Sequence, residues 1–168
     1  MATEAFPSDS LFEAISNIVK NTHRHIRYVL NNEMVQTYWK IGQLIVEDEQ
    51  HGRERANYGE QQLGKLAKRL IAEFGKGFEI SNLRRMRKFY LSFPNQDTLC
   101  PDLTWSHYRT LLRIEKTQAR LWYMQEAAQQ NWSVRALDRQ IGTLYYERLL
   151  ASQQRDSVVM VNKNRTLS

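Results

Sequence analysis

The chain has 168 residues, of which 42% are hydrophobic and 25% charged, proportions that are ordinary for a globular protein. That length allows one domain, or two small ones, with a substantial core. The single cysteine, Cys100, excludes an internal disulfide and fits a reducing compartment. The chain has no apolar run near 18 residues and no basic-then-apolar leader, so we expect neither a membrane span nor a signal peptide. The expected location is the cytoplasm.

The net charge of +6 is unevenly distributed along the chain. Residues 1–59 carry 6 Lys or Arg against 8 Asp or Glu, whereas residues 60–93 carry 8 against 3. A local excess of positive charge is the electrostatic footprint expected of a surface that binds phosphate groups. The charge distribution therefore directs attention to residues 60–93.

The first 50 residues predict a long helical region. Residues 1–9 lack periodicity and read as a disordered lead-in, and Ser10 with Glu13 forms a capping box. Apolar residues at helical spacing then run from Phe12 to Ile45 and weaken only at Asn31-Asn32. The pattern predicts a helical pair or one long helix with a joint. It could also pair with a second copy of the chain.

No metal site is expected in this region. His23 and His25 are two residues apart and so lie on different sides of a helix. A second group of candidate ligands is better explained as a solvated helix end: Glu47, Asp48, Glu49 and His51. The following residues, His51–Gly59, read as a polar loop.

Residues 60–93 predict two helices joined by a glycine turn. The first has an apolar face that ends at Phe74, and Gly75 and Gly77 stop it. Ser81 is the expected N-cap of the second helix. One face of that helix is apolar (Leu83, Met86, Phe89, Tyr90), and the other holds four cations (Arg84, Arg85, Arg87, Lys88).

The position of the cations within the second helix distinguishes two interpretations. Arg87 and Lys88 suit a last turn, but Arg84 and Arg85 are expected in the first turn, where the helix dipole is already positive. Each cation in the first turn destabilises the helix by about 0.3–1 kcal/mol unless an anion binds next to it. Helix, turn and basic helix is the layout of a helix-turn-helix that presents its second helix to DNA. The alternative is an ordinary solvated basic face.

The rest of the chain predicts further helices. Pro94 to Asp102 forms a connector, Thr104 caps a helix, another runs from Thr117 to Gln130, and Ser133 caps a last one. The inward residues expected for the last helix are Val134, Leu137, Ile141, Leu144 and Tyr145. Residues 151–168 read as a polar tail or the start of a linker.

A similar helix-turn-helix pattern recurs in this C-terminal part of the sequence. Aligning Phe78 with Trp132 pairs Leu83 with Leu137 and Arg85 with Arg139. A second helix-turn-helix-like unit would make Arg135 and Arg139 a second set of candidate contacts, although such turns also repeat by chance.

Three motifs together resemble a known family: EFGKGFEISNLRRMRKFY, LTWSHYRTLLRI and NWSVRALDRQI. In this order they resemble the N-terminal domain of the YhcG-type PD-(D/E)xK nucleases, a domain of unknown function. The resemblance covers Leu11 to Leu150. It implies an all-helical N-terminal domain, expected to bind DNA, that is joined to a C-terminal nuclease domain. Its role is inferred in that family, and no catalytic residue carries over.

The sequence contains no nuclease site of that type. Such a site needs two acids and a lysine on adjoining strands to hold a divalent cation. The one Pro-Asp, Pro101-Asp102, precedes a helix cap, and Glu115 and Lys116 are adjacent. We expect no catalysis, no cofactor, no metal and no small-molecule ligand in this chain.

The overall expectation is an all-α, multi-helix domain over residues 10–150 that binds DNA and positions a nuclease domain. The expected contacts are Ser81, Asn82, Arg84, Arg85, Arg87, Lys88, Arg135 and Arg139. The rival interpretation is a helical oligomerisation or protein-docking domain, based on the aromatic content and the four tryptophans: Trp39, Trp105, Trp122 and Trp132. The charge pattern alone also fits RNA.

Overall fold

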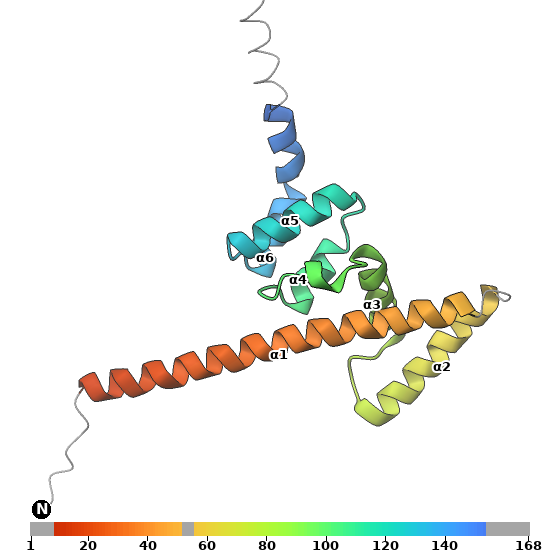
Figure 1. The fold of residues 1–168 in the computed structure, drawn as a ribbon, viewed down its shortest axis with the longest axis horizontal. Helices are drawn as coiled ribbons and strands as arrows, with labels where there is room; N and C mark the ends of the chain where they lie inside the picture. The colour runs from red at the N-terminus through yellow and green to blue at the C-terminus, as the bar shows by residue number, and fades with distance from the viewer. Residues whose placement is uncertain (1–8, 52–55, 154–168) are drawn as a thin grey trace, which may run out of the picture.

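The computed structural model describes residues 9–51 and 56–153, and over these residues it contains helices and no strands. This confirms the predicted all-α fold (Figure 1). The elements in chain order are α1 (Asp9–His51), α2 (Ala56–Phe74), α3 (Ile80–Ser92), the 3₁₀ helix η1 (Gln96–Thr98), α4 (Trp105–Leu111), α5 (Thr117–Gln129) and α6 (Val134–Gly142). A further helical segment covers residues 145–153. The predicted lead-in and polar tail lie outside the described residues, except for Asp9 and residues 151–153, which are helical.

Helix α1 is one continuous helix of 43 residues, about 65 Å long at 1.5 Å per residue. The joint expected at Asn31-Asn32 is absent. Asparagine costs a helix only about 0.7 kcal/mol relative to alanine, and no glycine or proline accompanies the pair. A weak point in the apolar pattern therefore did not break the helix.

Helix α2 begins earlier than its apolar pattern indicated. The sequence predicted a polar loop over His51–Gly59, whereas the structure places Ala56 to Gly59 within α2. Residues 52–55 lie outside the described part of the chain. Polar residues can extend a helix that is already nucleated, so apolar periodicity marks only the part that packs.

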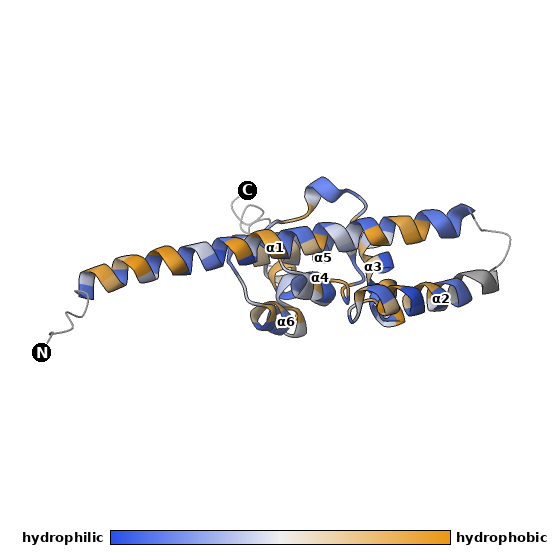
Figure 2. Cartoon of the chain, turned by 90° about the horizontal axis from the view of Figure 1, so that it is seen from below, coloured by the Kyte–Doolittle hydropathy of each residue, from blue (hydrophilic) through white to orange (hydrophobic). Residues whose placement is uncertain are grey.

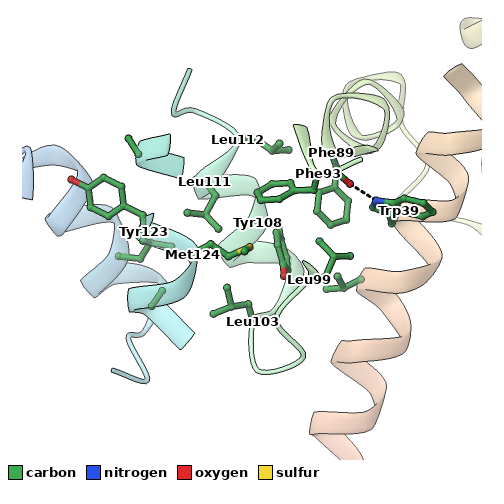
Figure 3. Packing of buried hydrophobic residues seen from close by; sticks show 14 residues of the cluster. Trp39, Phe89, Phe93, Leu99, Leu103, Tyr108, Leu111, Leu112, Tyr123 and Met124 are labelled. Atoms are coloured by element: carbon green, nitrogen blue, oxygen red, sulfur yellow. Dashed lines mark hydrogen bonds between the residues drawn. The ribbon is translucent and has the colours of Figure 1, made fainter. Parts of the chain in front are cut away.

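Two clusters of buried side chains form the core, and α3 contributes to both. Its first half adds Leu83 and Met86 to a cluster with α1 and α2. Its last turn and C-cap add Phe89 and Phe93 to a larger cluster, which joins α1 to α4, α5 and α6 (Figure 3). Trp105 packs against both clusters. The stretch with the strongest sequence signal is thus the centre of the fold.

The contact between α1 and α3 is close because α1 has a glycine there. A Cβ built on Gly42 would lie 2.0 Å from the carbonyl oxygen of Met86, so only glycine fits at this crossing. Nearby, the indole N–H of Trp39 donates to the carbonyl oxygen of Phe93 at 2.7 Å (Figure 3). The ring of Trp39 also meets that of Tyr90 edge-on, with centroids 5.0 Å apart. These contacts fix α3 against α1.

Helix α4 begins where predicted and is tied to the turn before α6. Thr104 precedes its first residue, and the backbone N–H of Thr104 donates to Nδ1 of the buried His107 at 3.1 Å. The other ring nitrogen of His107 lies 2.9 Å from the carbonyl oxygen of Trp132. A carbonyl can only accept, so Nε2 of His107 donates to it. One ring thereby joins α4 to the turn between α5 and α6.

The end of α6 differs from the expectation. Leu137 is buried and Ile141 half-buried, but Leu144 and Tyr145, both expected inward, are exposed. Helix α6 ends at Gly142, and Leu144 has a positive φ of 52°. The backbone therefore changes direction there, and the helical spacing on which the expectation rested no longer applies.

Candidate nucleic-acid interface

The turn between α2 and α3 is made by two glycines in the left-handed region. Gly75 has a φ of 81° and Gly77 a φ of 112°, conformations that favour glycine. Helix α3 then starts at Ile80, and its N-cap is Glu79, with φ −58° and ψ 149°. The expectation that Ser81 is the N-cap is wrong. The turn is complete two residues earlier, and Ser81 is exposed within the first turn.

The observed start of α3 places its four cations outside the first and last turns of the helix. With Ile80 as the first residue, Arg84 and Arg85 lie in the second turn rather than the first, and the last turn holds no basic residue. The dipole acts mainly within the first and last turns, so it neither penalises Arg84 and Arg85 nor favours Arg87 and Lys88. The case for a nucleic-acid surface therefore depends on which way the cations point.

The cations of α3 divide between two directions. Leu83, Met86 and Phe89 are fully buried, and they define the packed face. Four residues at positions i, i+3, i+4 and i+7 lie on the opposite side and are exposed: Ser81, Arg84, Arg85 and Lys88. We call these four residues the outer face of α3. Its three cations lie within about 6 Å of one another along the helix axis.

Two predicted contacts are engaged elsewhere. Nε of Arg87 donates to a carboxylate oxygen of Glu49 on α1 at 2.6 Å. The side-chain amide of Asn82 donates to the carbonyl oxygen of Gly77 at 2.6 Å. Arg87 therefore joins α3 to α1, and Asn82 holds the glycine turn. Glu49 also has a partner here that the sequence did not indicate.

Helix α2 adds cations that the predicted site omitted. Lys65, Lys68 and Arg69 are exposed on the side opposite the buried Leu63 and Ala67. Lys76 is exposed in the turn that follows. Their i, i+3, i+4 spacing is visible in the sequence, so the same reasoning used for α3 could have found them.

The second candidate set lies on α6. The side chain of Ser133 accepts from the backbone N–H of Ala136 at 3.2 Å, which confirms the predicted N-cap. Arg135 and Arg139 are exposed on the side away from the fully buried Leu137. Helix α4 packs against both α3 and α6. The two candidate sets are therefore on different helices that share α4 as a neighbour.

The two helix pairs α2–α3 and α5–α6 have corresponding features. In the alignment of Phe78 with Trp132, the N-cap Glu79 matches the N-cap Ser133, and Leu83 and Leu137 are both 0% exposed. Asn131 has a φ of 51° in the second turn, where the first turn uses glycines. Whether one unit arose from the other stays a prediction. Their similar local geometry supports considering them together.

One carboxylate near the outer face has a shifted pKa. The side chain of Glu79 accepts from the backbone N–H of Gly77, with both oxygens at 3.2 Å. Hydrogen bonds from the backbone of Glu79 itself and from Gly77 lower the pKa of this carboxyl below its usual value. The Glu79 carboxylate thus holds the glycine turn just before the basic helix, without capping that helix itself.

Two other groups have structural roles. The buried Arg120 donates to the carbonyl oxygens of Ile114 at 2.8 Å and Ser92 at 3.3 Å, so it holds α5 to the end of α3. Cys100 is half-buried. Burial, with the nearby Asp102, raises the pKa of its thiol. A raised thiol pKa disfavours the reactive thiolate.

Within residues 9–51 and 56–153, no three His, Cys, Asp or Glu side chains gather as metal ligands would. None of the helices in this part of the chain is both long and apolar enough to cross a membrane. The four tryptophans offered as interface candidates are buried or half-buried in the larger cluster.

Comparison with known proteins gives a family and a named relative. The family model for the DUF1016 N-terminal domain matches residues 14–148. The chain is 33% identical over 181 aligned residues to a protein of Escherichia coli (strain K12) named "Putative nuclease YhcG". The match covers 89% of this chain and 48% of that protein, so the chain spans about half the length of its relative. No solved structure matches.

Proposed function

This chain belongs to the family of DUF1016 N-terminal domains, and from that premise we propose that it binds duplex DNA and positions a nuclease domain on it. The observation that carries the proposal is the outer face of α3. It presents Arg84, Arg85 and Lys88 on the exposed side of a helix whose opposite side is fixed in the core. Any cleavage would be carried out by a domain outside this chain.

The geometry favours contacts to phosphates over deep reading of bases. Helix α3 packs against α1, α2 and α4, so it offers one face and cannot enter a groove with its whole circumference. Phosphate contacts position a protein without selecting a sequence. The hydroxyl of Ser81 would donate a hydrogen bond to the phosphate backbone of the DNA. We therefore propose binding with little dependence on DNA sequence, as suits a domain that delivers a nuclease.

Arg135 and Arg139 on α6 would add a second contact, and the cations of α2 would widen the first. The salt dependence of binding distinguishes contacts from α3 alone from contacts that also include α6 or α2. Each neutralised phosphate contributes about −0.9 to the slope of log K against log salt concentration. Three contacts from α3 predict a slope of about −3, and two more from α6 would bring it to about −4.5.

The test is a fluorescence anisotropy titration of the chain against duplex DNA of random sequence over a range of salt concentrations. We expect measurable binding at low salt that weakens steeply as salt rises. The variant Arg84→Glu/Arg85→Glu should abolish binding, and Arg135→Glu/Arg139→Glu should reduce the slope by about 2. Lys20→Glu/Arg24→Glu on α1 is the matched control, because it changes the charge equally at exposed positions on another helix. Circular dichroism would verify that each variant is folded.

Absence of binding at low salt by the folded chain would overturn the proposal. Equal loss in the α1 control and the α3 variant would show that net charge, not the outer face of α3, governs binding. Tighter binding to duplex RNA of the same sequence would replace DNA by RNA as the partner.

A second candidate function is a protein-docking domain. The tryptophans no longer support it, since they pack in the core. What favours it instead is the exposed apolar surface on the N-terminal half of α1. The two functions use different helices and are compatible.

A further inference from the structure

We propose that residues 11–30 of α1 form an antiparallel coiled coil with the same residues of a second copy of this chain. The N-terminal half of α1 extends beyond the rest of the fold (Figure 1), and apolar bands alternate with polar ones along its ribbon (Figure 2). Eight of its large apolar side chains are 43–67% exposed: Leu11, Phe12, Ile15, Ile18, Val19, Ile26, Val29 and Leu30. We call this set the α1 stripe. A protein in water does not leave so large a contiguous apolar surface uncovered without a partner.

The α1 stripe faces away from the body of the fold. In the C-terminal half of α1 the buried side is marked by Val35, Trp39 and Val46. At about 100° per residue, the α1 stripe centres on roughly the opposite side of the helix axis. The described part of the chain therefore packs on one side of α1 and leaves the other open. A second helix could lie along the stripe without meeting α3 or α4.

The spacing within the stripe is that of a two-helix coiled coil. Alternating steps of three and four residues connect six positions: Phe12, Ile15, Val19, Thr22, Ile26 and Val29. This is a 3.5-residue repeat, the period that keeps one seam facing a partner helix. Four of the six residues are Ile or Val, so β-branched apolar side chains make up most of the seam.

The antiparallel direction follows from how the six positions match. When two copies run in opposite directions, Phe12 meets Val29, Ile15 meets Ile26, and Val19 meets Thr22. The polar Thr22 then faces an apolar side chain, whereas a parallel pair would place the two Thr22 residues together.

The buried area is sufficient for a stable dimer. At 25 cal/mol per Å², the gain of about 1.5–3 kcal/mol for burying a large apolar side chain corresponds to roughly 60–120 Å². Eight such side chains would remove roughly 500–950 Å² from water on each copy, a range that includes the area of about 800 Å² per partner in standard interfaces. The pairing uses none of the cations on α3, so it does not depend on the proposed DNA binding.

Sedimentation velocity of the chain without DNA tests the pairing. We expect a species of twice the 19.9 kDa mass of one chain at micromolar concentration. The variant Ile15→Glu/Ile26→Glu should be monomeric, with unchanged helical circular dichroism because both side chains lie outside the core. The matched control is Leu121→Glu/Leu150→Glu, which alters exposed leucines off the stripe and should remain dimeric.

Cysteine cross-linking tests the direction, in a background of Cys100→Ser. We expect chains carrying Ile15→Cys to form disulfides with chains carrying Ile26→Cys, and neither to do so with itself. Self-linking of each would establish a parallel pair and overturn the proposed direction. A monomer at all concentrations, or a dimer that survives Ile15→Glu/Ile26→Glu, would overturn the proposed pairing and leave the stripe to another partner.

Discussion

Arg87 on α3 and Glu49 on α1 form an ion pair, with Nε and the carboxylate oxygen 2.6 Å apart. The side chains are 41% and 29% exposed, so solvent screens the pair and its contribution to stability is about 0.2–1 kcal/mol. Its larger consequence is for the candidate interface. The pair directs one of the four cations of α3 to α1 and leaves three near the outer face.

Removing the acid should release that cation. We expect Glu49→Gln to lower the free energy of unfolding by less than about 1 kcal/mol and to tighten DNA binding a few-fold, because Arg87 becomes available to phosphates. Urea denaturation and anisotropy titration would measure the two effects. Arg87→Gln is the control, because it breaks the same ion pair but leaves no released cation to contact phosphate. Weaker binding by Glu49→Gln would contradict the assignment of the cations.

The crossing of α1 and α3 should not tolerate a methyl group. We expect Gly42→Ala to lower the free energy of unfolding by about 1–3 kcal/mol or more, because its Cβ would overlap the carbonyl oxygen of Met86. Urea denaturation is the measurement. Gly64→Ala is the matched control: the nearest atom to its Cβ is 3.8 Å away, and alanine should stabilise α2 by about 0.5–1 kcal/mol. Equal effects at the two glycines would show that the close approach is absent.

The guanidinium of Arg120 should not be replaceable by an amine. Its NH1 and NH2 groups donate in different directions, to Ile114 and Ser92, and it lies over the ring of Phe93 at 5.5 Å. Lysine carries a single point charge and cannot make both contacts. We expect Arg120→Lys to lower the melting temperature by several degrees, equivalent to about 1–3 kcal/mol. The exposed Arg135→Lys should change it little, and an unchanged melting temperature for Arg120→Lys would count against this role.

Glu79 should make stability depend on pH at the acid end. Its pKa is lower in the folded chain than the ordinary value for a glutamate, so the folded state holds this proton less tightly than the unfolded state. The stabilisation it contributes is therefore complete above the unfolded pKa and is lost as the pH falls through the folded pKa. We expect urea midpoints of the wild type to decline more between pH 6 and about pH 3 than those of Glu79→Gln. Parallel pH curves would show that Glu79 makes no contribution.

Local sequence patterns determined most helix positions. Thr104 and Ser133 precede their helices as predicted, and the range of α5 follows from apolar spacing. The core face of α3 was also predictable, because Leu83, Met86 and Phe89 repeat at helical intervals in a short helix. The family resemblance was confirmed over residues 14–148. These features depend on residues near one another in the chain, where propensity and periodicity act directly.

Contacts between distant residues were decided by the tertiary structure alone. Periodicity shows that a helix has an apolar side but not what covers it, so the buried half of α1 and its exposed stripe look alike in sequence. The same limit hid the pairing of Arg87 with Glu49, 38 residues apart, and the close approach at Gly42. Even the start of α3 depended on backbone angles at Gly75 and Gly77. The sequence alone shows that this helix is basic. Only the packing of α3 against α1 shows which side each cation occupies.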